Sequence, residues 1–309
     1  MTKVLFSAGK DDWAKYRDVL PAALAEAGVS ADIGPDILPE EAEYIVYSPA
    51  SMLQDFSVFP RLKAVLNLWA GVEEVVGNRT LQVPLARMSD TGLRQGMIEY
   101  VLCHCLIHHL GQHGVLGKQD GIWRHAPPPL ASERTVAVLG LGELGQAVAD
   151  ALRDVGFNVT GWSRRAKSLD GIETHAGDDG LRNVLSGADI LVLLLPQTSE
   201  TTNIIDAEAL ALLPDGAALI NPGRGPLIDD DAVIAALDSG RLAHATLDVF
   251  RKEPLPKDHP FWAHPKVTVT PHIAASTRPA SASRVIAENI RRGENSEDFM
   301  LLVDRKSGY

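Results

Sequence analysis

Two patterns of apolar and polar positions alternate along the chain: short apolar runs, and longer stretches in which apolar residues recur with the period of an α-helix. In the N-terminal part the short runs predict strands, and the longer stretches predict a helix ended by Gly28 and a long buried helix. The predicted strands are 3–8, 44–47, 62–68 and 84–88, and the predicted helices are 11–27 and 92–110. A Pro-rich break follows at 126–134, although a loop inside a domain would have the same composition.

The alternation is strongest between residues 135 and 272. The predicted strands there are 135–139, 157–162, 189–195, 217–221, 244–249 and 267–271, and the predicted helices are 143–155, 181–186, 206–212 and 229–238. A final helix capped by Ser276 or Thr277, with Pro279 in its first turn, runs to about Arg292. This alternation indicates an α/β fold with parallel sheets and helices on both faces.

Composition and charge narrow the class of protein. The chain has 309 residues, enough for two domains, and a net charge of −11, which argues against nucleic acid and anionic membrane surfaces as partners. Its two cysteines, Cys103 and Cys105, lie too close together to join distant segments and fit a reducing compartment. We find no signal-peptide layout and no apolar run near the roughly 18 residues of a membrane span, so we expect a cytoplasmic protein.

Residues 136–145 read VAVLGLGELG, in which Gly140, Gly142 and Gly145 form the G-x-G-x-x-G pattern of dinucleotide sites. A strand precedes the pattern, and a helix and second strand follow, as a cofactor-binding βαβ unit requires. The helix N-terminus would then face the pyrophosphate, with Leu141, Glu143 and Leu144 beside it. The alternative is a bare α/β turn without a ligand.

The end of the second strand bears on the choice of cofactor. NAD sites place Asp or Glu there for the ribose hydroxyl, whereas this chain has Ser163, Arg164 and Arg165. Two guanidinium groups can hold a 2′-phosphate through forked hydrogen bonds, so the sequence predicts NADPH in preference to NADH. In the alternative reading, one arginine stacks on the adenine and the other is solvated.

Polar groups follow four later strands, at the edge where open parallel sheets bind ligands. They are Pro196-Gln197-Thr198, Asn221-Pro222-Gly223-Arg224, Asp248 with Glu253, and His272. An arginine, a carboxylate and a histidine next to a nicotinamide are the groups that reduction of a 2-keto acid needs. Taken singly, each has an ordinary explanation as a surface ion pair, a solvated turn or a loop residue.

Five segments resemble the D-isomer-specific 2-hydroxyacid dehydrogenases over nearly the whole chain. They are VAVLGLGELG, LLLPQTSETTNII, LINPGRGPLID, ATLDVFRKEPLP and TVTPHIAAST. GWSRR at 161–165, HPFW at 259–262 and VDRKSGY at 303–309 look most like the NADPH-dependent glyoxylate/hydroxypyruvate reductases of that family.

The resemblance implies two Rossmann-like or flavodoxin-like domains with parallel sheets and an active-site cleft between them. The substrate-binding domain would comprise residues 1–98 and 285–309, and the dinucleotide-binding domain residues 99–284. A homodimer is expected on the same basis.

The resemblance also implies roles for individual residues. Arg224 would bind the substrate carboxylate and carbonyl, His272 would be the general acid, and Glu253 its carboxylate partner. Backbone N–H groups of Ala70, Gly71 and Val72 would hold the substrate carboxylate. The implied cofactor contacts beyond the glycine loop and Ser163 to Arg165 are Pro196, Gln197, Thr198, Thr202, Asn221, Pro222, Gly223, Asp248, His272 and Ala274.

The implied function is NADPH-dependent reduction of a small 2-keto acid, glyoxylate to glycolate or hydroxypyruvate to D-glycerate. Departures from the family pattern, Glu73 where Asp is frequent and no arginine in IHHLGQHGVLGKQ, leave another substrate such as pyruvate or phenylpyruvate open. Pro222 is a third departure. A different class, a dinucleotide-sensing protein without turnover, fits less well because the three catalytic groups are intact and the chain has no long extension.

Two further features have both a functional and an ordinary structural explanation. Trp69 precedes the substrate loop and is either a wall of a small pocket or a core residue. His104, His108, His109 and His113 form two i, i+4 pairs, a spacing that zinc sites use, but the hydride chemistry needs no metal. We therefore expect no metal, and histidines that line a cleft or a subunit contact.

Overall fold

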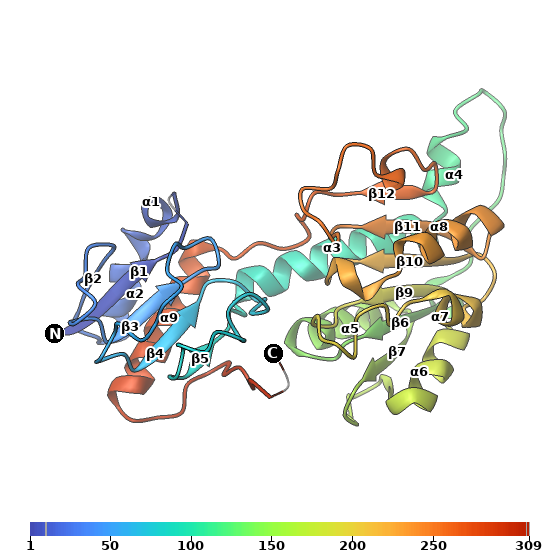
Figure 1. Ribbon diagram of the computed structural model, residues 1–309. Coiled ribbons are helices and arrows are strands. Elements are labelled where there is room, and N and C mark those ends of the chain that lie inside the picture. The colour runs from blue at the N-terminus through green and yellow to red at the C-terminus, as the bar shows by residue number, and fades with distance from the viewer. Residues whose placement is uncertain (10, 307, 309) are drawn as a thin grey trace. The chain divides into compact units, whose positions relative to one another are not determined.

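The computed structural model of the protein describes residues 1–9, 11–306 and 308 (Figure 1). The tail segment 303–309 is therefore described only in part, with 307 and 309 outside the described residues. The chain divides into two compact units, unit 1 (residues 1–93 and 276–309) and unit 2 (residues 94–275). Each unit is built on a parallel sheet, as the alternation of the sequence predicted.

The boundaries between the units, at 93/94 and 275/276, fall before the predicted ones at 98/99 and 284/285. Helix α3 (Thr91–His109) packs into the core of unit 2 from Met97 onward, and helix α9 (Pro279–Glu294) packs into the core of unit 1 from Ala282 onward. Packing partners that are distant in the sequence set these boundaries.

The described residues of unit 1 form five parallel strands in the order β2-β1-β3-β4-β5. They are β1 (Thr2–Ser7), β2 (Ala31–Gly34), β3 (Tyr44–Tyr47), β4 (Ala64–Asn67) and β5 (Leu85–Ala86). Alternate residues of β3 face opposite cores: Tyr44 and Val46 lie in one, and Ile45 and Tyr47 in the other.

In the residues of unit 1 that the structure describes, helices cover one face of this sheet and not the other. The helices α1 (Asp12–Tyr16), α2 (Val19–Glu26) and α9 pack on the face of Tyr44 and Val46. The opposite face is packed by the irregular chain between β3 and β5, through side chains such as Phe56 and Leu81. The expectation of helices on both faces is thus wrong for unit 1.

Unit 2 has seven parallel strands in the order β12-β11-β10-β9-β6-β7-β8. They are β6 (Thr135–Leu139), β7 (Asn158–Ser163), β8 (Glu173–Ala176), β9 (Ile190–Leu193), β10 (Ala217–Asn221), β11 (Leu242–Leu247) and β12 (Val267–Val269). The strand order reverses between β6 and β9, the position at which doubly wound sheets bind dinucleotides.

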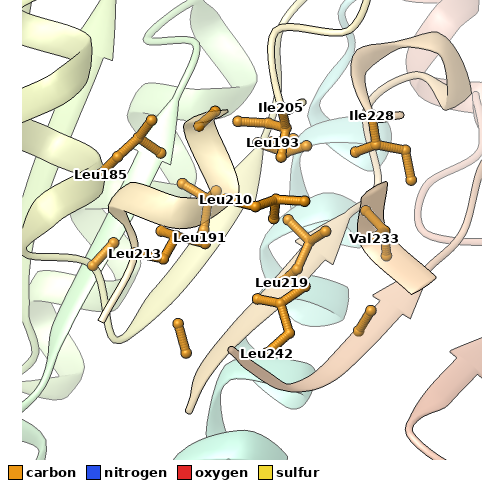
Figure 2. Packing of buried hydrophobic residues seen from close by; sticks show 14 of the residues in the cluster. Leu185, Leu191, Leu193, Ile205, Leu210, Leu213, Leu219, Ile228, Val233 and Leu242 are labelled. Carbon is orange, nitrogen blue, oxygen red and sulfur yellow. The ribbon is translucent and has the colours of Figure 1, made fainter. Parts of the chain in front are cut away.

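Both faces of this sheet carry helices (Figure 1). Helices α3 and α5 (Glu143–Val155) cover one face, and α6 (Gly177–Ser186), α7 (Ala207–Leu212) and α8 (Asp230–Ser239) cover the other. Figure 2 shows the core on the face covered by α6, α7 and α8, where Leu185 and Leu210 of the helices pack with Leu191 and Leu219 of the strands. Burial of an apolar side chain of this size contributes about 1.5–3 kcal/mol, so the core holds the strand ends in register.

Some elements differ from the prediction for identifiable reasons. Strands β2 and β8 were missed because they are edge strands of mixed polarity without an apolar run. Helix α4 (Gln112–Leu116) was also missed. The predicted helix 11–27 is two helices, because Pro21 has no N–H to continue one helix through Arg17.

The cap of the final helix is another correction. Arg278, and not Ser276 or Thr277, is the residue before the first turn of α9, and Pro279 is its first residue. The hydroxyl of Thr277 instead donates a hydrogen bond to the carbonyl oxygen of Leu68 at 2.8 Å. Because both residues belong to unit 1, this bond ties the start of the returning chain to the end of β4.

Candidate active site

The glycine loop lies at the point where the strand order of unit 2 reverses. Gly140 has φ +104°, and a Cβ there would stand 2.5 Å from the carbonyl oxygen of Leu194, which follows β9. A Cβ on Gly145 would collide with the carbonyl oxygen of Gly140. A Cβ on Gly142 would meet nothing within 4 Å, so its backbone is open to the approach of a ligand. The loop therefore has the shape that a pyrophosphate at the start of α5 requires.

Basic residues follow β7, as predicted. Arg164 and Arg165 are exposed, and Arg164 Nη1 lies 3.3 Å from Glu200 Oε2. The Ser163 hydroxyl donates to the carbonyl oxygen of Arg165 at 2.7 Å, which folds this turn. The sequence reasoning missed Lys167, whose ammonium donates a hydrogen bond to the carbonyl oxygen of Leu141 in the glycine loop. The run SRRAK was the signal that would have identified it.

The loop after β9 is organised by a threonine that was not predicted. Thr201 is buried, and its hydroxyl donates to the carbonyl oxygen of Pro196 at 2.7 Å and accepts from the N–H of Thr198 at 2.8 Å. The hydroxyl of Thr202 donates to the carbonyl oxygen of Thr198 at 2.8 Å. Pro196, Gln197 and Thr198 thus leave the sheet as a tight turn.

Asn221 at the end of β10 shapes the loop that carries Arg224. Its buried amide donates to the carbonyl oxygen of Arg224 at 2.9 Å, and its carbonyl oxygen accepts from the N–H of Gly223 at 3.2 Å. Pro222 and Gly223 are buried, and Arg224 is partly exposed. A Cβ on Gly225 would collide with the backbone of Phe250, so the Arg224 loop packs directly on the loop that carries Glu253.

His272 and Glu253 form a pair at the ends of β11 and β12. Nδ1 of His272 lies 2.6 Å from Oε2 of Glu253, and Oε1 of Glu253 accepts from the N–H of Phe250 at 2.9 Å. The side chains are 53% and 35% exposed, so the pair is accessible to a ligand. Because Nδ1 is bound to the carboxylate, the ring orientation is fixed and Nε2 is the nitrogen that can serve a substrate.

Asp248 supports the turn of His272 from within the protein. Its carboxylate is fully buried and accepts from the backbone N–H groups of Ile273 and Ala274, both at 2.9 Å. Its carbonyl oxygen accepts from the N–H of His272 at 2.8 Å. Of the predicted cofactor residues in this turn, Ala274 is buried and His272 is exposed.

The predicted substrate loop belongs to unit 1. Asn67, buried at the end of β4, donates from its amide to the carbonyl oxygens of Trp69 and Gly71, both at 2.8 Å. Val72 is buried in the core, whereas Trp69 is 43% exposed. Trp69 is therefore no core residue, and the packing alternative for it is wrong. Asn67 was missed, although an Asn that ends an apolar run was a usable signal.

Two of the four histidines, His108 of α3 and His113 of α4, pack against β11. His108 Nε2 lies 3.0 Å from the Thr246 hydroxyl, and the rings of His113 and His244 stack at 3.7 Å. His109 belongs to the other side, where it meets the ring of Phe157 edge-on. Burial lowers the pKa of His108 to about 3 and that of His244 to about 4, so both are neutral near neutral pH.

Within the described part of the chain, no three or more His, Cys, Asp or Glu side chains are arranged to hold a metal ion. None of the helices described there is both long and apolar enough to cross a membrane.

The sheet is doubly wound, with a glycine loop at its reversal point, and the two strands that follow the arginine loop carry a carboxylate paired with a histidine. These features define an oxidoreductase that uses a nicotinamide dinucleotide. Residues 105–274 match the family model described as D-isomer specific 2-hydroxyacid dehydrogenase, NAD binding domain. The chain therefore belongs to the D-isomer specific 2-hydroxyacid dehydrogenase family.

Curated relatives and solved structures agree with this. The glyoxylate/hydroxypyruvate reductase A of Serratia proteamaculans (strain 568) is 40% identical over 299 residues, which are 94% of this chain and 94% of that protein. One similar solved structure is a D-isomer specific 2-hydroxyacid dehydrogenase from Xanthobacter autotrophicus Py2 in complex with NADPH and MES. It superposes with a TM-score of 0.93 at 40% sequence identity, and the match covers 100% of this chain and 99% of that chain. The NADPH-dependent glyoxylate/hydroxypyruvate reductase of Sinorhizobium meliloti, solved with NADP and sulfate, gives a TM-score of 0.87 at 34% identity, with 100% of both chains covered.

Proposed function

We propose that the protein reduces glyoxylate and hydroxypyruvate with NADPH. The observation that carries this proposal is the His272–Glu253 pair, with 2.6 Å between Nδ1 and Oε2. The pair follows β11 and β12 at the same edge of the sheet where the loop of Arg224 follows β10. The names of the similar reductases support the choice of substrate. Their complexes with NADPH and NADP support the choice of cofactor.

A bound reduced nicotinamide supplies the hydride that the carbonyl carbon of the keto acid accepts. Arg224 binds the carboxylate and polarises the carbonyl, which orients the substrate and stabilises the negative charge that develops on its oxygen. His272, protonated on both nitrogens, donates the proton from Nε2 to that oxygen. Glu253 accepts from Nδ1 and fixes the orientation of the ring.

The net charge of −11 makes the local cation necessary, because the overall field repels an anionic substrate. We assign Ala70, Gly71 and Val72 of unit 1 to the substrate carboxylate and the glycine loop of unit 2 to the pyrophosphate. Arg164, Arg165 and Ser163 hold the 2′-phosphate, and Lys167 adds a third cation to this group. Asp248 and the turn at Pro196 lie along the nicotinamide half.

The test is to follow NADPH and NADH oxidation by the purified protein with glyoxylate, hydroxypyruvate, pyruvate and phenylpyruvate. We expect turnover to be fastest with NADPH and one of the first two acids. Faster reduction of pyruvate or phenylpyruvate would assign a different substrate to the same chemistry. NADPH binding without turnover of any of the four would support the dinucleotide-sensing alternative.

Substitution of the two proposed groups completes the test. His272→Ala and Arg224→Ala should each lower kcat/KM by at least about 10²- to 10⁴-fold, the usual contribution of a general acid. NADPH affinity, measured by fluorescence, serves as the control for folding. Near-wild-type turnover in either variant would overturn the assignment.

We propose a homodimer in the cytoplasm. The chain after α3 exposes apolar side chains that an aqueous surface disfavours: Trp123 is 91% exposed, Leu116 69% and Ile122 63%. Cys103 and Cys105 are free thiols, which a reducing compartment maintains. Sedimentation equilibrium of the wild type and of Trp123→Ser tests the dimer: a monomeric wild type would contradict it.

A further inference from the structure

Three side chains link helix α3 to the turn that carries His272. The Tyr100 hydroxyl lies 2.7 Å from the Thr270 hydroxyl, which donates to Oδ1 of Asp248 at 2.6 Å. A hydroxyl has one proton to donate, and that of Thr270 is committed to the carboxylate. Tyr100 is therefore the donor to Thr270, and the direction of the chain is fixed: Tyr100 to Thr270 to Asp248.

Burial keeps this direction stable. Tyr100 of α3 is partly buried against the core of unit 2, and burial raises the pKa of its hydroxyl above the usual range, so it stays protonated and able to donate. Asp248 is fully buried, and a buried carboxylate is costly unless donors satisfy it. The Thr270 hydroxyl and the N–H groups of Ile273 and Ala274 are those donors.

The turn around His272 gains little stabilisation from apolar burial. His272 has φ +54°, a left-handed conformation that costs a residue with a side chain on the order of 1–2 kcal/mol. Ile273 is 60% exposed, and His272 and Pro271 are exposed as well, so apolar burial does not fix their positions. The Asp248 backbone and carboxylate fix them instead, on both sides of the histidine.

We propose that Thr270 and Tyr100 are positioning residues of the reaction: they orient the Asp248 carboxylate, which holds the backbone of His272 in the conformation that pairs its ring with Glu253. This inference rests on the proposed function. Neither side chain needs to touch substrate, because an error of about 1 Å in the place of a general acid lowers the rate strongly.

The same sheet offers a matched control. Thr246 of β11 is fully buried, and its hydroxyl also pairs with a side chain of α3, His108, at 3.0 Å. Within the described residues, the hydrogen bonds to the Asp248 carboxylate come from Thr270, Ile273 and Ala274, and not from Thr246. Thr246→Val therefore removes a comparable buried hydrogen bond and should lower stability by about 1–3 kcal/mol, as Thr270→Val should.

The experiment compares Thr270→Val, Thr270→Ser, Tyr100→Phe and Thr246→Val in the full chain. We expect Thr270→Val to lower kcat at least about tenfold with a smaller change in the KM of the keto acid, and Tyr100→Phe to lower it about two- to fivefold. Thr270→Ser, which keeps the hydroxyl, should restore most of kcat, and Thr246→Val should leave it unchanged. Equal losses in Thr270→Val and Thr246→Val would show a structural role only and overturn the proposal.

Amide hydrogen exchange separates this proposal from the proposed function. The N–H groups of Ile273 and Ala274 should exchange faster in Thr270→Val than in the wild type, but not in Thr246→Val. Unchanged exchange at both amides would overturn the inference even if the wild type reduces keto acids. A wild type that turns over none of the acids would refute the proposed function, whatever the exchange result.

Discussion

Nδ1 of His272 lies 2.6 Å from Oε2 of Glu253, although the two residues are 19 positions apart and follow different strands. Strands β11 and β12 pair in parallel, so both loops leave the sheet at the same edge. The N–H of Phe250 holds the other oxygen of the carboxylate. The pair is therefore built by the sheet, and its chemistry can be tested through either partner.

Glu253→Gln should lower kcat/KM about 10- to 100-fold, because a misplaced general acid lowers the rate strongly. An amide has one acceptor oxygen where the carboxylate has two, so it cannot accept from both the His272 ring and the N–H of Phe250, and the ring loses its fixed orientation. The measurement is kcat/KM for the preferred keto acid. Lys252→Gln, in the same exposed loop, is the control, and an unchanged kcat/KM in Glu253→Gln would contradict the role.

Arg224→Lys should raise the KM of the keto acid and lower kcat/KM by about 10²-fold. Lysine keeps the charge but lacks the planar fork that binds a carboxylate and a carbonyl together. Initial rates at several substrate concentrations separate KM from kcat. The affinity for NADPH should stay unchanged, and a variant with wild-type KM would rule out a direct contact between Arg224 and the substrate.

Arg164→Ala should lower kcat/KM for NADPH about 10- to 100-fold and leave that for NADH nearly unchanged. A charge-assisted hydrogen bond to a phosphate contributes about 1.5–3 kcal/mol, and NADH has no 2′-phosphate. Arg182→Ala, an exposed arginine of α6, controls for the change in net charge. Equal losses with both cofactors would assign Arg164 a structural role.

Gly145→Ala and Gly142→Ala should separate folding from binding in the glycine loop. The methyl group of Gly145→Ala would collide with the Gly140 carbonyl, so we expect a loss of at least about 3 kcal/mol in the free energy of unfolding. That of Gly142→Ala meets no protein atom within 4 Å and should cost about 1 kcal/mol or less. It should still weaken NADPH binding, because it stands where the pyrophosphate approaches.

Thermal unfolding and NADPH titration of both variants provide the measurements. A Gly142→Ala variant with wild-type affinity would place the pyrophosphate elsewhere. A stable Gly145→Ala variant would contradict the close packing of α5 on the loop.

The buried histidines predict a loss of stability in mild acid. Burial, together with the neighbouring His113 and His104, lowers the pKa of His108 to about 3 and of His244 to about 4. In the unfolded chain both take up a proton below about pH 6.5, whereas the folded protein keeps them neutral. The free energy of unfolding should therefore fall as pH drops from about 6.5 to about 4, by at most about 1.4 kcal/mol per pH unit for each histidine.

Chemical denaturation between pH 7 and 5 measures this slope. His244→Gln should make it shallower, and His125→Gln, at an exposed position outside the cluster, should leave it unchanged. Identical slopes in all three proteins would show that these histidines do not control acid stability.

The sequence by itself determined the features that depend on local pattern. Apolar runs gave the central strands of both sheets, and the spacing of Gly140, Gly142 and Gly145 gave the loop at the start of α5. Arg224, Glu253 and His272 could be selected as candidates because each follows a predicted strand, and parallel strands end at one edge. Such signals lie within a few residues of the feature they predict.

Only the tertiary structure decided the features that join distant segments. The edge strands β2 and β8 form because a neighbouring strand offers them hydrogen bonds, and their own residues carry no apolar run. The tight turn at Thr201, the approach of Lys167 to Leu141, and the chain from Tyr100 through Thr270 to Asp248 join residues by contacts that no local pattern encodes. Hydrophobic burial leaves an apolar pattern in the sequence, and this pattern predicts which segments become strands and helices. Hydrogen bonds between these elements depend on distances and angles that are defined only when the sheet and the helices are packed together.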